Sequence, residues 1–224
     1  VEEVAVYTLD GNLYLAGNQP RAALSAVYCF LQNELEVRWL WPGSDGEFIP
    51  NKKSWALPEL KFNHRPGFAY RGFHLCGDWR DVEMFREWMG RNFINIHRHA
   101  APPEQQRRGF YSMWSSHNVV LSKALFDRHP EYFAEIGGKR YTSNICLSNP
   151  EVDRIVAADT AAYLRKRPFL EILSVFPSDN QDYCRCPQCA KVDVSTAWFA
   201  FYNRLTDTLK KEFPDLKFAT IAYQ

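Results

Sequence analysis

The chain has 224 residues, 46% hydrophobic and 24% charged, which is enough apolar material for one large domain or two small ones with a buried core. Its net charge of +1 argues against a nucleic-acid-binding protein, which needs a basic face to neutralise phosphates. No apolar run approaches the roughly 18 residues of a membrane-spanning helix. The aromatic content of 15% fits either a large aromatic core or a surface that stacks on sugar rings.

The first 60 residues predict a small α+β domain. Residues 4–15 alternate as a hairpin does, with Asp10-Gly11 at its turn. Residues 20–35 have apolar positions at helical spacing, with Cys29 as a small buried residue. VRWLWPGSDGEFIP then predicts strand, turn and strand. Residues 50–67 contain three prolines and little pattern, and are expected to form a linker.

Strands and helices alternate from residue 68 onward. This pattern predicts right-handed βαβ crossovers and a parallel sheet, hence an α/β fold. The chain ends on a strand without a covering helix, so we expect the first half of a (β/α)8 (TIM) barrel, strands one to four, over residues 68–224. The expected elements are strands at 68–76, 93–99, 169–180 and 216–224, helices at 81–92, 149–167 and 196–213, and a long irregular insertion at 100–148.

Several segments carry a family resemblance in order along nearly the whole chain. They are RAALSAVYCFLQNELEVRWLWPG, FAYRGFH, HPEYFAEIGGKRY, CLSNPEV, SVFPSDN, YCRCPQCAK and FATIAYQ. The chain resembles a bacterial family of unknown function found in secreted polysaccharide-degrading proteins. The family's architecture is similar to that of α-glucuronidases and β-hexosaminidases, a small α+β domain before a (β/α)8 barrel. The resemblance implies a secreted or periplasmic protein that contacts oligo- or polysaccharide.

Polar side chains gather at the expected ends of the parallel strands, which form the active face of a barrel. Asp179 is the predicted catalytic carboxyl group, since glycosidases use a pair of carboxyl groups; the alternative is a loop cap within SDN. His97 and His99 form an H-x-H pattern that could bind a metal, but no third ligand is evident at a fixed spacing. The residues predicted to bind substrate are His74, His97, His99, Asn180 and Tyr223 at strand ends, and Trp114 and His117 in the insertion.

Three cysteines, Cys184, Cys186 and Cys189, follow the strand that carries Asp179. Cys146 precedes a helix whose start should lie on the same side of the barrel, so it is the predicted fourth member. Three states stay open: a structural Zn²⁺ site, disulfides, and free thiols. In the first two states the cysteines fix the loop that holds Asp179 and take no part in chemistry.

The sequence therefore predicts a carbohydrate-active, glycoside-hydrolase-like protein without the second half of its barrel. The chemistry requires no cofactor, and zinc is expected only in a structural role. The alternative is a non-catalytic glycan-binding or scaffold module. A second carboxyl group about 5–9.5 Å from Asp179 distinguishes the two.

Overall fold

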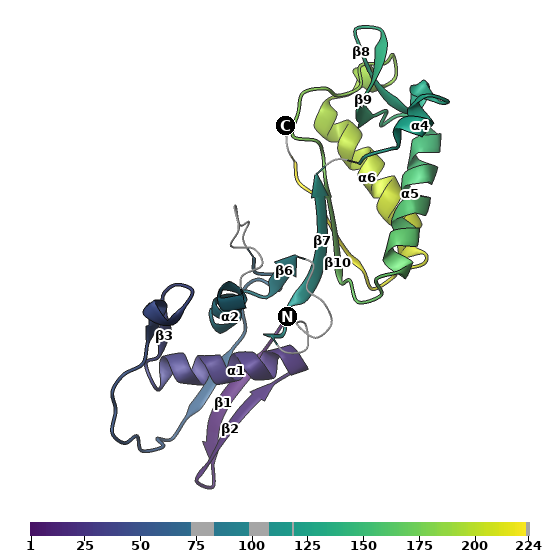
Figure 1. Cartoon of the computed structure of the whole chain (residues 1–224). Helices are drawn as coiled ribbons and strands as arrows, with labels where there is room; N and C mark the ends of the chain where they lie inside the picture. The colour runs from purple at the N-terminus through teal and green to yellow at the C-terminus, as the bar shows by residue number, and fades with distance from the viewer. Residues whose placement is uncertain (73–82, 99–107, 118, 223–224) are drawn as a thin grey trace. The chain divides into compact units, whose positions relative to one another are not determined.

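The computed structural model describes residues 1–72, 83–98, 108–117 and 119–222 (Figure 1). The chain divides into two compact units, Val1–Ser112 and Met113–Gln224. This division follows the density of contacts along the chain. The boundary between residues 60 and 68 predicted from the sequence rests on a change of pattern, and it stays a prediction.

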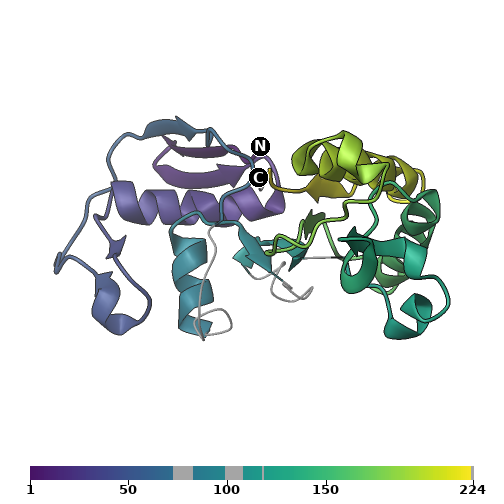
Figure 2. The same cartoon turned by 90° about the horizontal axis from the view of Figure 1, so that it is seen from above.

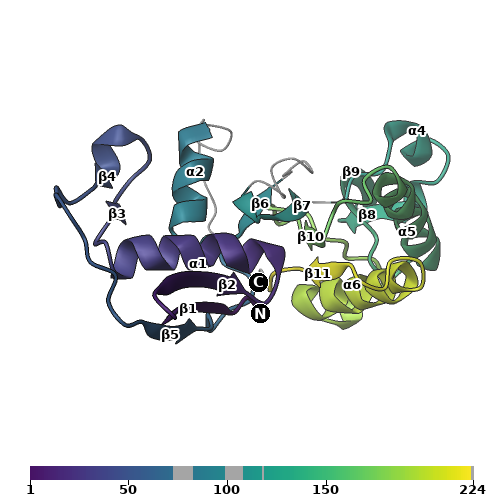
Figure 3. The ribbon, with the colours of Figure 1, turned by 90° about the horizontal axis from the view of Figure 1, so that it is seen from below.

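The first unit contains a three-stranded antiparallel sheet in the order β2-β1-β5. The helix α1 lies along one face of this sheet (Figures 2 and 3). The elements of this unit are β1 (Val4–Leu9), β2 (Asn12–Gly17), α1 (Pro20–Asn33), β3 (Arg38–Trp39), the 3-10 turn η1 (Ser44–Gly46), β4 (Glu47–Phe48), β5 (Lys61–His64), α2 (Glu83–Arg91) and β6 (Ile96–Arg98).

The predicted hairpin and first helix are confirmed. Asp10 and Gly11 both have positive φ, as a tight turn between β1 and β2 requires. Cys29 is buried among small residues of α1 and the first strand. Gly17 allows the end of β2 to approach α1 closely, because a Cβ on Gly17 would lie 2.3 Å from the backbone nitrogen of Ala23.

The predicted linker at residues 50–67 is wrong for its last part. Lys61–His64 forms β5, which pairs antiparallel with β1. The strand has only four residues, all of them exposed, and it lies between prolines. No local sequence pattern therefore predicts it. Backbone hydrogen bonds to β1 hold these residues as a strand, and such pairing cannot be read from sequence periodicity.

The second unit contains a parallel sheet in which β10 lies between β7 and β11. Residues of β7 fall on both sides of the boundary between the units. The elements are β7 (Tyr111–His117), α4 (Lys123–Phe126), the 3-10 turn η3 (Pro130–Tyr132), β8 (Phe133–Ile136), β9 (Lys139–Ile145), α5 (Pro150–Arg165), β10 (Ile172–Phe176), the 3-10 turn η4 (Cys189–Lys191), α6 (Val194–Lys210) and β11 (Lys217–Ala219).

The core of the second unit lies between this sheet and the helices α5 and α6, which pack side by side (Figure 1). Leu173 of β10 and Phe201 of α6 are fully buried in it. The α5 helix begins where predicted, because the side chain of Asn149 accepts a hydrogen bond from the backbone N–H of Glu151. These features confirm the α/β class and the parallel sheet.

The insertion expected at residues 100–148 is not irregular throughout. Tyr111–His117 forms β7 and pairs with β10 in parallel register, so the sheet has a strand that the sequence pattern did not predict. Its sequence, YSMWSSH, has no β-branched residue and includes three serines, two of them buried. Gly137 and Gly138 have positive φ and form the turn that joins β8 to β9.

Within the described residues, no helix has the length and apolar character needed to cross a membrane.

Candidate functional site

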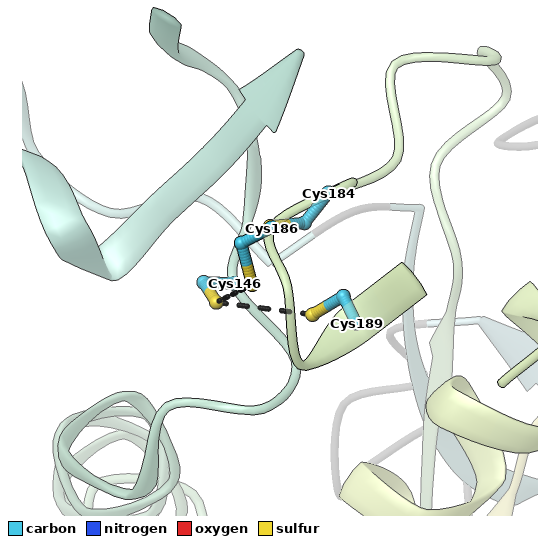
Figure 4. A group of neighbouring side chains, drawn as sticks. All are labelled: Cys146, Cys184, Cys186 and Cys189. Atoms are coloured by element: carbon cyan, nitrogen blue, oxygen red, sulfur yellow. Dashed lines mark hydrogen bonds between the residues drawn. The ribbon is translucent and has the colours of Figure 1, made fainter. Parts of the chain in front are cut away.

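Four cysteine side chains meet in the second unit (Figure 4). Cys146 follows β9 directly, and Cys184, Cys186 and Cys189 lie on the segment that joins β10 to α6. All four are buried, and their sulfur atoms lie within 4.8 Å of one another. The four are free cysteines, without a disulfide among them. The structure thus brings together the predicted metal-binding set, and the group could bind a metal ion.

The sulfur spacing fits a tetrahedral cation. The Sγ atom of Cys146 lies 3.8 Å from that of Cys186 and 3.9 Å from that of Cys189. A tetrahedron with metal–sulfur bonds of about 2.3 Å, the usual Zn–S length, has edges of about 3.8 Å. These sulfur atoms therefore suit a zinc-sized ion without a large rearrangement of the chain.

Polar groups beside the sulfur atoms favour negative charge at this cysteine site. The backbone N–H of Glu135 donates to Cys184 Sγ at 3.3 Å, and Arg140 Nη1 lies 3.9 Å from the same sulfur atom. The hydroxyl oxygen of Ser148 lies 3.2 Å from Cys189 Sγ. Four thiolates around a divalent cation carry a net charge of −2, so a guanidinium and hydrogen-bond donors nearby stabilise the assembly.

Hydrogen bonds among the thiols ease the first deprotonation. Side-chain hydrogen bonds with Cys184 and Cys189 lower the pKa of Cys146. The pKa of Cys184 is raised for the reciprocal reason, because its proton takes part in the bond to Cys146. Since metals bind thiolates and not thiols, a site that already stabilises one thiolate is prepared for a cation.

A second group of polar side chains lies at the carboxyl ends of β7 and β10. His117 is the last residue of β7 and stands opposite Phe176 of β10 in the parallel register. Its Nδ1 atom lies 3.5 Å from Oδ1 of Asp179, and the two side chains are 39% and 59% exposed. This strand-end site, His117 with Asp179, therefore presents a carboxyl group and an imidazole to solvent, and both can form hydrogen bonds with a ligand.

Asn144 of β9 holds the backbone around Asp179. Its Nδ2 donates to Oδ1 of Asn180 at 2.8 Å and to the carbonyl of Asp182 at 2.9 Å, and its Oδ1 accepts from the hydroxyl of Ser178. Asn144 itself is buried. The predicted substrate-binding residue Asn180 thus has a structural partner on one side of its amide.

Trp114 lies elsewhere in the second unit. Its ring lies 5.2 Å from that of Tyr163 on α5, against the core. Both rings line a cavity of about 280 Å³ whose walls are otherwise largely apolar. Because side chains alternate along a strand, Trp114 and His117 leave opposite faces of β7. The structure does not bring Trp114 to the strand-end site, and its predicted role in binding stays a prediction.

The other predicted residues belong to the first unit or lie outside the described residues. His97 belongs to the first unit, where it is buried and its ring stacks on Phe110 at 5.6 Å. His74, His99 and Tyr223 lie outside the described residues. The common rim that joins these residues to Asp179 therefore stays a prediction.

The roles of Asn144, Arg140 and Ser148 were not predicted from the sequence. Asn144 begins a segment that is buried from Asn144 to Leu147, and only the structure shows this burial. Arg140 and Ser148 gave no signal of their own. They contact the cysteine site from positions about 40 residues away in the sequence, which only the fold brings close.

Comparisons with known proteins give a family and a fold. A search of the curated proteins finds no match. Among solved structures, the chain is similar to the glycoside hydrolase CpGH89 from Clostridium perfringens in complex with its substrate GlcNAc-alpha-1,4-galactose, with a TM-score of 0.62 and 10% sequence identity. The match covers 100% of this chain and 33% of that protein, so this chain spans about a third of its length. The model of one family, "Domain of unknown function (DUF4838)", matches residues 41–224, and the chain belongs to that family.

Proposed function

We propose that the chain is part of a carbohydrate-active, glycoside-hydrolase-like protein that acts on the glycosidic bonds of oligo- or polysaccharides. The observation that carries the proposal is the likeness of the whole chain to CpGH89, at a TM-score of 0.62. At 10% identity this likeness concerns the fold alone. The proposed chemistry therefore rests on the residues of this chain.

The strand-end site offers groups that suit a sugar. Asp179 is exposed, so its carboxyl group can reach a ligand, either as one of the two catalytic carboxyl groups of a glycosidase or as an acceptor for sugar hydroxyls. The imidazole of His117, beside it, can donate a hydrogen bond to a hydroxyl or orient the carboxylate. This chemistry requires no cofactor.

The parallel strands belong, in this proposal, to the first half of a (β/α)8 barrel. The fact that the chain spans about a third of CpGH89 supports a longer protein with further strands. Those strands supply the second carboxyl group, about 5–9.5 Å from Asp179. The family resemblance seen in the sequence extends the proposal to a secreted or periplasmic location.

The second candidate is a non-catalytic glycan-binding module. It is favoured by the residues at the carboxyl ends of the two strands that flank β10. His117 ends β7, and Thr220, Ile221 and Ala222 follow β11, so neither place supplies a carboxyl group among the residues that the structure covers. A binding module needs hydrogen-bond donors and acceptors there but no pair of carboxyl groups.

The full-length protein, offered a panel of oligosaccharides that includes GlcNAc-α-1,4-galactose, tests both candidates. Release of a shorter sugar, measured by chromatography, supports the hydrolase. Binding measured by calorimetry without release supports the binding module. Neither release nor binding across the panel overturns the proposal of a carbohydrate function.

We also propose that the cysteine site holds one structural zinc ion. Four thiolates form a soft, closed ligand set, which is typical of structural zinc and leaves no open position for catalysis. The ion would join the end of β9, through Cys146, to the segment after β10, through the other three cysteines. Elemental analysis of the purified protein should then find about one zinc per chain.

A further inference from the structure

Two segments distant in sequence are joined at two neighbouring places. One segment is the end of β9, with Asn144 and Cys146, and the other runs from Ser178 to Cys189. Asn144 binds Ser178, Asn180 and Asp182, and two residues farther along each segment the cysteine site begins. The amide of Asn144 and the four cysteines therefore act as adjacent links between the same two segments.

The link through Asn144 leaves little freedom to the backbone on either side of Asp179. Ser178 precedes Asp179 and is buried, and its carbonyl also accepts a hydrogen bond from the hydroxyl of Tyr183 at 2.8 Å. Asn180 follows Asp179, and its Oδ1 accepts from both Asn144 Nδ2 and the backbone N–H of Asp182. The side chain of Asp179 is left pointing outward toward His117.

A metal at the cysteine site would strengthen this arrangement. Cys146 and Cys184 are 38 positions apart, and bringing such segments together has an entropic cost that a bound ion offsets. Without the ion, the two segments are held to each other by hydrogen bonds such as those of Asn144. The second segment is also held to β8, by the bond from the backbone N–H of Arg185 to the carbonyl of Glu135 at 2.7 Å. The net contribution of any one of these hydrogen bonds to stability is small.

We infer that Asn144 is a positioning residue, which transmits the order imposed by the metal at the cysteine site to the strand end that carries Asp179. The inference rests on the proposed zinc site and not on the proposed action on sugars. Metal occupancy then sets how well Asp179 is held against His117, although neither residue touches the metal-binding cysteines in any contact described above.

Residue-resolved amide hydrogen exchange of the 224-residue chain, with zinc content measured on the same samples, tests the inference. The amide of Arg185 reports on the cysteine segment, and the amide of Asp182, which donates to Asn180 Oδ1 at 3.0 Å, reports on the strand end. Removing zinc with a strong chelator should speed the exchange of both amides by about tenfold or more.

The variant Asn144→Ala separates the two links. It should keep about one zinc per chain and the protection of Arg185, while the amide of Asp182 exchanges about tenfold faster. The ¹⁵N signals of the His117 ring should also shift, because Asp179 no longer stays beside it. The matched control is Asn149→Ala, which removes a helix cap three residues from Cys146 and should leave both the Asp182 amide and the His117 ring unchanged.

Unchanged exchange at Asp182 after zinc removal, or unchanged His117 signals in Asn144→Ala, overturns the inference while leaving the zinc site standing. Protein that binds no zinc overturns both. Should Asn144→Ala fail to fold, Asn180→Ala removes the acceptor from the partly exposed side of the same link. It should give the same shift at His117, and the absence of that shift overturns the inference. The amide of Asp182 loses its own acceptor in this variant, so only the His117 ring serves as the reporter.

Discussion

The Nδ1 atom of His117, the last residue of β7, lies 3.5 Å from Oδ1 of Asp179, which follows the end of the neighbouring parallel strand β10 by three residues. Both side chains are partly or largely exposed, so the core does not depend on them. The carboxyl ends of parallel strands form the active face in barrels of the predicted type. Substitutions at this pair should therefore alter ligand chemistry more than stability.

On the proposed hydrolase function, the variant Asp179→Asn should remove most of the cleavage of an oligosaccharide by the full-length protein. Asparagine keeps the shape of the side chain but cannot ionise or transfer a proton, so we expect a loss of about 100-fold or more in kcat. The melting temperature should stay within a few degrees, because the side chain is exposed. Kinetic assays on a cleaved oligosaccharide and a thermal melt measure both quantities.

The matched control is Asp182→Asn, an exposed carboxyl group three residues along the same segment. It should leave kcat near the wild-type value. Equal losses in both variants would indicate that the segment's charge matters in general. A melt lowered by many degrees in Asp179→Asn alone would instead identify Asp179 as a loop cap.

The variant Cys186→Ser should contain clearly less than one zinc ion per chain. A serine hydroxyl is a poor substitute for a thiolate ligand, so the site would retain three sulfur atoms. Because an ion present at 1,000 times its dissociation constant stabilises the folded state by about 4 kcal/mol, the melting temperature should fall as well. Elemental analysis and thermal melts, with and without chelator, measure the two effects.

The control for the cysteine variant is Cys29→Ser. Cys29 is also buried, but it packs in α1 among alanines and lies in the other unit. This variant should lower stability without changing the zinc content. Chelation that leaves the wild-type melt unchanged would count against a structural ion at the cysteine site.

Helices and hairpins with their own local signals were predictable from the sequence. The Asp10-Gly11 turn and the Asn149 cap followed by Pro150 mark element boundaries through backbone chemistry that acts within a few residues. The strands β5 and β7 were not predictable, because KFNH and YSMWSSH lack an alternating apolar pattern. Pairing with β1 and β10 determines these strands, and that information lies elsewhere in the chain.

The candidate sites show the same division. Dense spacing identified Cys184, Cys186 and Cys189, and a topological argument from the start of the helix at residue 149 identified Cys146 as their neighbour. The role of Asn144 could not be predicted, because its partners lie 34 to 38 positions away. Only the folded chain shows which buried amide meets which loop.

The helix cap of α6 gives a pH-dependent contribution to stability. Hydrogen bonds from the hydroxyl of Thr196, and from its backbone N–H, lower the pKa of Asp193. A lowered pKa means that the folded state favours the carboxylate. The stabilisation is therefore present above the unfolded pKa of about 3.9 and is lost as pH falls through the folded value.

The variant Asp193→Asn keeps a side-chain acceptor for the cap but does not titrate. The wild-type protein should therefore lose more stability than the variant as pH falls below about 4. Chemical unfolding at several pH values between neutrality and about pH 2.5 measures the difference. Because both proteins carry the same cysteine site, loss of metal in acid affects them alike, and parallel curves would show that Asp193 makes no such contribution.

The variant Arg140→Gln should weaken metal binding without removing a ligand. Arg140 lies beside Cys184 Sγ, donates to the carbonyl of Phe133 at 2.7 Å and pairs with Glu135 at 2.9 Å. Glutamine can retain a hydrogen bond but carries no charge to offset the net −2 of a zinc–thiolate centre. Loss of such a supporting group typically reduces metal affinity by about 10- to 100-fold.

Competition with a chromophoric chelator measures this affinity, and Lys139→Gln is the matched control. Lys139 is the exposed neighbour of Arg140 at the start of β9 and has no described contact to a cysteine. The substitution Lys139→Gln therefore removes one positive charge, as Arg140→Gln does, without altering the surroundings of the cysteines. We expect the control to bind zinc as tightly as the wild-type protein. If both variants lose affinity equally, the effect is one of overall charge, which added salt should abolish. If neither variant loses affinity, Arg140 serves only to hold β8 against β9, through Phe133 and Glu135.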